Sequence, residues 1–405
     1  MSMPIAERAS PASAARAAEE RSPFARLNDL LAPVAPGKPA INCAVGEPQH
    51  PVPAFVGPVL AAHIADFGRY PANKGTEEFR RAAVGWLARR YALPAALDPE
   101  RHVIVLNGTR EGLFLGAIAA RRHVGPRRGT PAILIPNPFY AAYAAGADAA
   151  GCETVYLAAT AAHGFLPDLD ALPEETLART VAFYLASPAN PQGAVADKTY
   201  LARLVALARR FGFLVFADEC YSEIYSAQKP AGTLEQAGPD YASVIVFHSL
   251  SKRSNLPGLR VGFAAGDAAF LARFIELRNV AAPQVPMPAQ AVAVAAYGDE
   301  AHVEENRRLY KAKFDLADQI IGNRYGYRRP AGGFFLWLDV SAHGGSETAT
   351  LKLWREAGVR VLPGGYAART QADGFNPGAD YIRIAMVHDR ETTAEALHRL
   401  VAVLQ

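Results

Sequence analysis

Short apolar runs alternate with amphipathic segments along most of this chain. Six runs rich in Val, Ile, Leu and Phe, each expected to be a buried strand, occupy residues 103–106, 132–135, 154–157, 181–185, 214–216 and 244–247. Apolar residues recur at helical spacing between them, most clearly over residues 76–91, 111–121 and 198–211. This alternation predicts an α/β fold in which helices sandwich a mainly parallel sheet.

The pattern changes after residue 288. A long helical pattern covers residues 289–321 with an expected break near Gly298, and apolar strands at 332–338 and 381–385 then alternate with helices at 348–357 and 393–404. Near the other end, a short helix over 23–31 precedes a cluster of prolines that indicates a boundary near residue 50. We therefore expect a mobile N-terminal arm (1–22), a large domain (51–288), and a smaller α+β domain built from residues 23–50 and 289–405, the latter including a linking helix.

Composition excludes several classes of protein. The net charge of the 405 residues is only +3 and the basic residues are scattered, whereas a nucleic-acid-binding surface needs a dense basic face. The three cysteines are far apart and the ten histidines are dispersed, so neither a disulfide framework nor a metal site is expected. No apolar run approaches the roughly 18 residues that span a bilayer. We expect a cytoplasmic protein without a nucleic-acid, membrane or metal partner.

Five of the predicted strands are each followed by a cluster of polar or aromatic residues. In chain order the clusters contain Gly108-Thr109-Arg110, Tyr140, Asn190, Asp218 with Tyr221, and Ser249 with Lys252. Ligands of parallel sheets bind outside the carboxyl ends of the strands, so these side chains are expected to surround one pocket. Together they offer backbone N–H groups that can bind a phosphate and an aromatic ring that can stack on a ligand. They also offer a side-chain amide, a carboxylate, a phenol and an amine.

The lysine in the last cluster is placed for chemistry. Lys252 lies just past a strand end among hydroxyls, and its amine can form a Schiff base with a carbonyl cofactor. Ser249, Ser251 and Arg260 can supply donors and a charge for the phosphate of that cofactor. Ser-x-x-Lys alone is also consistent with a solvated loop lysine, and the functional interpretation depends on the five clusters occurring together.

These motifs resemble those of the class I/II aminotransferases, which are fold type I enzymes dependent on pyridoxal 5'-phosphate (PLP). The resemblance covers nearly the whole chain through Gly46-Glu-Pro48, Tyr70-x4-Gly75, Gly108-Thr109, Asn190-Pro191-x-Gly193, Asp218-x-x-Tyr221, Ser249-x-Ser-Lys252, Gly258-x-Arg260-x-Gly262 and Arg383. The longer forms around Asp218 and Lys252, with Asn376-Pro-Gly378, are similar to the N-succinyldiaminopimelate aminotransferases of bacterial lysine biosynthesis.

The resemblance implies a role for each matching residue. Lys252, Asp218 and Tyr221 are the expected catalytic residues, with Lys252 attached to PLP and Asp218 facing the pyridine nitrogen. Asn190 and Tyr221 are expected at the phenolic oxygen and Tyr140 at the ring face. The residues expected around the phosphate are Gly108, Thr109, Arg110, Ser249 and Arg260, with Tyr70 contributed by the other subunit of a homodimer. The substrate carboxylate is expected to contact Gly46, Asn190 and Arg383, although Arg383 taken alone also fits a solvent-facing residue of an alternating strand.

The implied reaction is a ping-pong transfer of an amino group between amino-acid and 2-oxo-acid substrates, with the pair glutamate and 2-oxoglutarate. The expected second substrate is N-succinyl-LL-2,6-diaminopimelate; an aspartate or aromatic amino acid aminotransferase and a PLP-dependent C–S lyase are the alternatives. The group that binds the distal acid of the substrate is left open among Arg110, Arg253 and Arg369. The chain departs from the family at Gln192, where threonine is usual, and there we expect only a role in shaping a turn.

Overall fold

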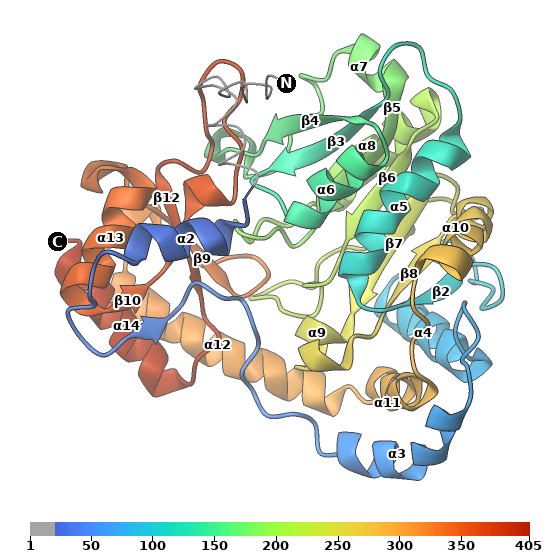
Figure 1. The fold of residues 1–405 in the computed structure, drawn as a ribbon, viewed down its shortest axis with the longest axis horizontal. Helices are drawn as coiled ribbons and strands as arrows, with labels where there is room; N and C mark the ends of the chain where they lie inside the picture. The colour runs from blue at the N-terminus through green and yellow to red at the C-terminus, as the bar shows by residue number, and fades with distance from the viewer. Residues whose placement is uncertain (1–20) are drawn as a thin grey trace, which may run out of the picture.

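The structure, a computed structural model, describes residues 21–405, so the expected N-terminal arm lies outside the described residues except for its last two positions (Figure 1). A seven-stranded sheet in the order β2-β8-β7-β6-β5-β3-β4 forms its centre. The strands are β2 (Val103–Leu106), β3 (Ala132–Asn137), β4 (Glu153–Ala158), β5 (Thr180–Ala186), β6 (Leu214–Asp218), β7 (Val244–Ser249) and β8 (Gly262–Gly266). All six predicted strands of the large sheet are present.

The sheet is mainly parallel, which confirms the expected fold class. Strands β4, β3, β5, β6 and β7 pair in parallel, whereas β8 is antiparallel to both β7 and β2. Because β8 reverses direction relative to both of its neighbours, β2 and β7 run the same way. The carboxyl ends of all strands except β8 therefore meet at one edge of the sheet, where the polar clusters follow.

Helices cover both faces of this sheet (Figure 1). The helices of this part of the chain are α3 (Val56–Ala62), α4 (Glu77–Arg90), α5 (Thr109–Val124), α6 (Ala141–Ala149), α7 (Glu174–Arg179), α8 (Lys198–Phe211), α9 (Leu250–Arg253), α10 (Ala268–Ala281) and α11 (Met287–Gly298). Of these, α3 lies against α11 and not on the sheet. Alternate strand residues belong to opposite layers: Val103 and Val105 pack in the core with α4 and α11, whereas Ile104 and Leu106 pack in the core with α5, α6 and α10. The sheet is thus buried on both sides, as its continuous apolar runs predict.

Local signals explain where α8 begins and ends. The Asp197 carboxylate accepts a hydrogen bond from the Tyr200 amide and so caps the first turn, while Gly212 ends the helix in a left-handed conformation with φ of 69°. Helix α6 was not predicted, because its sequence, Ala-Ala-Tyr-Ala-Ala-Gly-Ala-Asp-Ala, has almost no contrast between apolar and polar positions.

A second, smaller set of elements surrounds a three-stranded antiparallel sheet in the order β11-β12-β9. Its strands are β9 (Phe335–Asp339), β11 (Leu362–Pro363) and β12 (Tyr381–Ala385), and its helices are α2 (Pro23–Leu31), α12 (Ala301–Ile321), α13 (Gly345–Ala357) and α14 (Arg390–Val403). A separate parallel pair joins β1 (Ile41–Asn42) to β10 (Val359–Arg360). This pairing places the segment before residue 50 beside the C-terminal elements (Figure 1).

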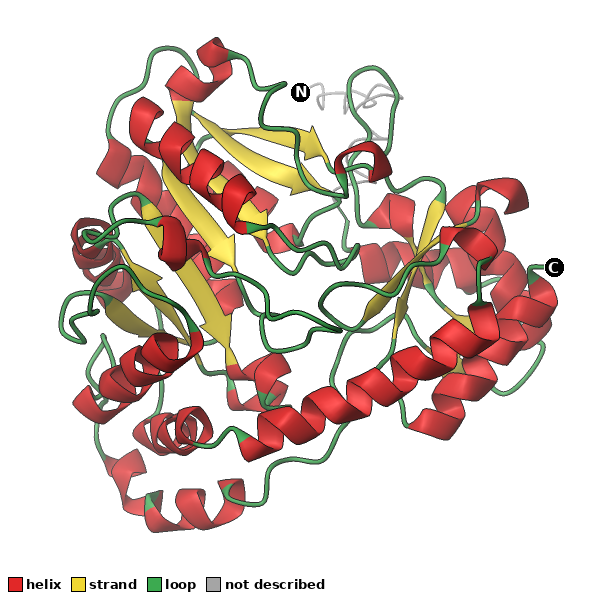
Figure 2. Cartoon of the chain, turned by 180° about the vertical axis from the view of Figure 1, so that it is seen from behind, coloured by secondary structure: helices red, strands yellow, loops and turns green. Residues whose placement is uncertain are grey.

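The long helix α12 runs between the two sets of elements (Figures 1 and 2). Helix α11 packs with α4 in the core of the large sheet, through Val292, Ala293 and Ala296. Tyr310 and Phe314 of α12 instead pack in the core of the small sheet. We propose that the large domain extends from residue 51 through α11 and that α12 links it to the small domain.

Two further properties concern the described part of the chain. No helix within residues 21–405 is long and apolar enough to cross a membrane. Cys43, Cys152 and Cys220 are all free thiols.

Candidate active site

The polar clusters meet at the carboxyl edge of the large sheet, where loops of the small domain also arrive. Hydrogen bonds connect residues that are far apart in the sequence: Lys252 to Gly46, Arg383 to Asn190, and Tyr143 to Asp218. Thr109 Oγ1 is 3.1 Å from the Cys220 Sγ beside Asp218, and the charges of Arg383 and Arg260 act on Lys252. The clusters that follow five separate strands, together with the loop at Gly46 and strand β12, therefore form one site.

Lys252 is half-buried and belongs to the short helix α9, directly after β7. The Ser249 hydroxyl caps this helix by accepting a hydrogen bond from the Ser251 amide at 3.1 Å. The Lys252 Nζ donates to the Gly46 carbonyl oxygen at 2.5 Å. Burial lowers the pKa of Lys252 from 10.5 to about 8, and the nearby charges of Arg383 and Arg260 also lower it. A minor fraction of this amine, on the order of a tenth at pH 7, is therefore unprotonated and can accept a proton.

Asp218 is the last residue of β6, and its carboxylate is held on both oxygens. Oδ1 accepts a hydrogen bond from the Cys220 amide at 3.2 Å, and Oδ2 accepts one from the Tyr143 hydroxyl at 2.8 Å. Tyr143 is itself stacked on Tyr184, with ring centroids 4.6 Å apart. A carboxylate oriented in this way can favour the protonated form of a ring nitrogen placed beside it. Tyr143 was missed from the sequence because it lies on the unpredicted helix α6.

An anion-binding cradle lies at the N-terminus of α5. Gly108 caps this helix with φ of 72°, and a Cβ atom there would collide with the guanidinium of Arg260. Arg260 has a left-handed backbone (φ 57°), and its Nη1 donates to the Pro257 carbonyl oxygen at 2.8 Å. The hydroxyls of Ser249, the last residue of β7, and of Ser251 on α9 are 2.9 Å apart. A helix N-terminus, an arginine and hydroxyl groups suit a phosphate, and the glycine lets the Arg260 guanidinium approach the helix end.

Arg383 lies on β12 and is only 7% exposed, so the alternative of a solvent-facing arginine is wrong. Its Nη1 donates to Asn190 Oδ1 at 3.1 Å and its Nη2 to the Ala44 carbonyl oxygen at 2.6 Å. The guanidinium lies 4.5 Å from the ring centroid of Phe335. Burial lowers the pKa of Arg383 to about 10, which leaves it charged at neutral pH. Its planar fork, beside the Lys252 amine, suits a carboxylate.

Two tyrosines of the predicted site line the same region. Tyr221 packs edge-on against Phe334, with centroids 5.3 Å apart, and burial raises the pKa of its phenol well above the usual value, so the hydroxyl stays protonated at neutral pH and can donate a hydrogen bond. Tyr140 precedes α6, and its hydroxyl accepts a hydrogen bond from Arg110 Nε at 2.6 Å. Arg110 is exposed, at the rim of the site.

The three arginines considered for the distal acid of a substrate lie in different surroundings. Arg253 is buried, pairs with Glu300 at 2.5 Å and donates to the Ala296 carbonyl oxygen, so its charge is already used inside the protein and it is neither a surface residue nor a substrate ligand. Arg369 lies over the Phe139 ring, 5.1 Å from its centroid. Arg110 donates a hydrogen bond to the hydroxyl of a predicted site residue, Tyr140.

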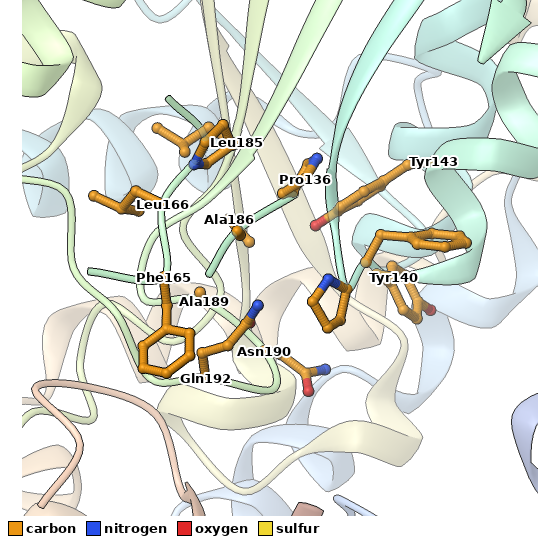
Figure 3. A pocket seen from close by; sticks show the side chains of 14 residues that line it. Pro136, Tyr140, Tyr143, Phe165, Leu166, Leu185, Ala186, Ala189, Asn190 and Gln192 are labelled. Carbon is orange, nitrogen blue, oxygen red and sulfur yellow. The ribbon is translucent and has the colours of Figure 1, made fainter. Parts of the chain in front are cut away.

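A pocket at the carboxyl ends of β3 and β5 adjoins these residues (Figure 3). Tyr140, Tyr143 and Asn190 line it, and Phe165 and Leu166 contribute an apolar wall. Gln192 also lines this pocket, and its buried Nε2 has no hydrogen-bond partner among the described residues. The position at which the chain departs from the family thus contributes a side chain to the pocket.

Comparisons with known proteins agree with this geometry. Residues 38–400 match the family described as aminotransferase class I and II. The LL-diaminopimelate aminotransferase of Desulforudis audaxviator is 36% identical over 93% of this chain and 94% of its own length, and that of Syntrophobacter fumaroxidans is 32% identical over 93% and 95%.

Solved structures are similar over most of the chain. An aminotransferase from Neisseria meningitidis has a TM-score of 0.89 and 36% identity, covering 95% of this chain and 98% of that one. A probable N-succinyldiaminopimelate aminotransferase from Thermus thermophilus has a TM-score of 0.81 and 26% identity, covering 94% and 100%.

Proposed function

This chain belongs to the family of class I and II aminotransferases, and from that premise we propose that it transfers an amino group between N-succinyl-LL-2,6-diaminopimelate and 2-oxoglutarate. The products are N-succinyl-2-amino-6-oxopimelate and glutamate, and in the cell the reaction can run in the reverse direction. It is a PLP-dependent enzyme. One juxtaposition supports the proposal best: the Arg383 guanidinium, ordered by Asn190 and Ala44, lies close enough to the half-buried Lys252 amine for its charge to lower the pKa of that amine. The free thiols fit a reducing compartment, and we place the enzyme in the cytoplasm.

The residues of the site fit PLP. When bound, PLP supplies an aldehyde that condenses with amines and a ring that draws electrons from the α-carbon of the substrate. We assign the Gly108 cradle with Thr109, Ser249 and Arg260 to its phosphate, because only glycine at 108 lets the Arg260 guanidinium lie against the N-terminus of α5. We assign Asp218 to the pyridine nitrogen, Asn190 and Tyr221 to the phenolic oxygen, and Tyr140 to the ring face.

The chain's own groups then orient the substrate and move a proton. Arg383 binds the α-carboxylate with Asn190, which directs the α-carbon toward Lys252. The Lys252 Nζ accepts the proton from the substrate α-carbon and would deliver it to the reacting carbon of the cofactor. A pKa of about 8 suits both accepting and donating the proton near neutral pH. The two half-reactions use the same groups in reverse order, as a ping-pong cycle requires.

The distal end of the substrate separates two candidate functions. N-succinyl-LL-2,6-diaminopimelate carries acidic and amide groups there, which suits the exposed Arg110 at the rim. Free LL-diaminopimelate carries a distal ammonium as well, and it is the substrate named for the curated relatives of 36% and 32% identity. Glu47, close enough to Lys252 to raise its pKa, is a carboxylate of the site that suits an ammonium.

A direct competition tests this choice. We expect glutamate formation from 2-oxoglutarate with a kcat/KM at least about tenfold higher for N-succinyl-LL-2,6-diaminopimelate than for LL-diaminopimelate, and Arg110→Met should reduce that preference. Products are followed by chromatography, with aspartate and phenylalanine as comparison substrates. The reverse preference would assign the enzyme to LL-diaminopimelate. Release of pyruvate and ammonia from cystathionine, without glutamate, would indicate a C–S lyase.

We further propose that the enzyme is a homodimer in which Tyr70 completes the partner's phosphate site. Tyr70 is 95% exposed, and Ile64 and Phe67 in the turns just before it are exposed as well. Val52 and, on α10, Val280 are further exposed apolar side chains. Tyr70 has no hydrogen bond within its own chain among those found for residues 21–405, which is consistent with a role across an interface.

Mixing two inactive variants tests this assignment. Tyr70→Ala and Lys252→Ala subunits, unfolded and refolded together, form hybrid dimers in which one site has both native residues if Tyr70 acts across the interface. We expect the mixture to regain up to about one quarter of wild-type activity, because about half of the dimers are hybrids with one intact site. A mixture no more active than Tyr70→Ala alone, or a wild-type mass equal to the 43.3 kDa of one chain, would contradict the proposal.

A further inference from the structure

Three partly or fully buried polar side chains from distant segments form a continuous chain of hydrogen bonds behind the active site. Lys313 Nζ donates to His50 Nε2 at 2.7 Å and to the Met386 carbonyl oxygen at 3.1 Å. His50 Nδ1 is 2.5 Å from Asn306 Oδ1. Asn306 Nδ2 donates to the carbonyl oxygens of Lys252 and Arg253 at 3.2 and 3.3 Å. We call His50, Asn306 and Lys313 the positioning chain.

The donors and acceptors of the positioning chain are mutually consistent. Because the Asn306 amide nitrogen faces two carbonyl oxygens, its oxygen must face His50 and accept the Nδ1 proton. His50 then accepts from the Lys313 ammonium through Nε2, which requires the neutral imidazole. Burial lowers the pKa of His50 to about 4, so the ring is neutral at physiological pH. Each group therefore donates to the next: Lys313 to His50, His50 to Asn306, and Asn306 to the carbonyl oxygen of Lys252.

The two ends of the positioning chain reach both halves of the proposed reaction centre. Asn306 contacts the main chain of α9 at Lys252 itself, while Met386 follows Arg383 by three residues at the end of β12. Between these ends, His50 belongs to the loop whose Gly46 and Ala44 carbonyl oxygens accept from Lys252 and Arg383. The same loop is therefore anchored by groups from α12.

We propose that His50, Asn306 and Lys313 are positioning residues that fix the main chain of Lys252 relative to the Arg383 fork. Burying an ammonium and two polar side chains is costly, and apolar residues would fill this volume with less loss of free energy. What the polar groups add is direction: each hydrogen bond specifies where the loop at residue 50 and the helix α9 lie. This inference rests on the proposed roles of Lys252 and Arg383.

Substitutions at His50 separate positioning from simple packing. His50→Phe keeps a ring against Tyr310, whose centroid is 4.4 Å away, but removes both hydrogen bonds. His50→Gln keeps one donor and one acceptor. We expect His50→Phe to lower kcat by about tenfold or more. It should also shift the pH midpoint of the visible absorbance of bound PLP by at least about half a unit. His50→Gln should show smaller changes in both quantities. Asn306→Ala is expected to match His50→Phe.

Tyr241→Phe is the matched control. Tyr241 is fully buried, and its hydroxyl donates a hydrogen bond to the Ala95 carbonyl oxygen. Tyr241 lies just before the amino end of β7, so it is at the opposite edge of the sheet from the site. Loss of this hydroxyl should lower the unfolding temperature while leaving kcat and the absorbance midpoint unchanged. If His50→Phe also leaves kcat and the absorbance midpoint unchanged, the proposed positioning role is refuted. This conclusion holds even if Asn306→Ala fails to fold. Wild-type protein without PLP absorbance would instead refute the proposed function.

Discussion

Lys252→Ala is expected to abolish the visible absorbance of attached PLP and to lower kcat by on the order of 10⁵-fold or more, because one amine both attaches the cofactor and moves the α-proton. Absorbance before and after addition of glutamate, together with single-turnover rates, measures both losses. Lys198→Ala is the control, since Lys198 is exposed on α8 and pairs with Glu235 at 3.1 Å, away from the site. Turnover within tenfold of wild type in Lys252→Ala would contradict the assignment.

The same substitution should not destabilise the cofactor-free protein at neutral pH. Burial lowers the pKa of Lys252 from 10.5 to about 8, so below pH 8 the amine is charged in both the folded and the unfolded chain, and burying the charge costs on the order of 3 kcal/mol. This cost decreases as the pH rises from about 8 to 10.5, where only the unfolded chain remains protonated. Thermal unfolding should therefore show the largest advantage of Lys252→Ala at pH 7 and a smaller one at pH 9.5.

Asp218→Asn is expected to leave PLP attached but to slow proton transfer by about 10²- to 10⁴-fold. The asparagine oxygen can still accept the hydrogen bond from the Cys220 amide, and its Nδ2 can donate to the Tyr143 hydroxyl oxygen, so the side chain keeps two partners while the negative charge is lost. Without that charge the ring nitrogen is no longer favoured in its protonated form, and the ring withdraws electrons less strongly. Single-turnover rates with glutamate deuterated at the α-carbon measure the step directly.

Tyr143→Phe separates charge from orientation. This variant removes the 2.8 Å hydrogen bond to Asp218 but keeps the carboxylate and the stacking on Tyr184. We expect a loss of about tenfold, well below that of Asp218→Asn. Equal losses in the two variants would mean that orientation, and not charge, is the contribution of Asp218, and wild-type rates in Asp218→Asn would refute its assigned role.

Much of the fold was predictable because its signals are local. The run Val103–Leu106 and the run at 181–185 are apolar throughout, which in a chain of this pattern indicates strands buried on both faces. Helix α8 has a cap, an apolar stripe and a terminal glycine within a single short segment. Helix α6 has none of these, and its helical state depends on packing against α5, which no local pattern records.

The candidate site was predictable only in part. The rule that ligands bind at the carboxyl ends of parallel strands brought Asp218, Asn190 and Lys252 to one place, and family resemblance supplied the role of each. Burial could not be inferred in the same way. Arg253 is adjacent to Lys252 in sequence but points into the core toward Glu300, and Arg383 proved buried although its strand pattern also fitted exposure.

The amino-acid sequence by itself determined which side chain follows which strand, and hence the family and its cofactor, because a strand and the loop after it are continuous in the chain. Only the tertiary structure decided which polar groups pair. His50 and Lys313 are 263 residues apart, and Arg383 and Asn190 are 193 apart. Their hydrogen bonds, and the burial that lowers the pKa of Lys252, arise from contacts between distant segments, which no local pattern of residues specifies.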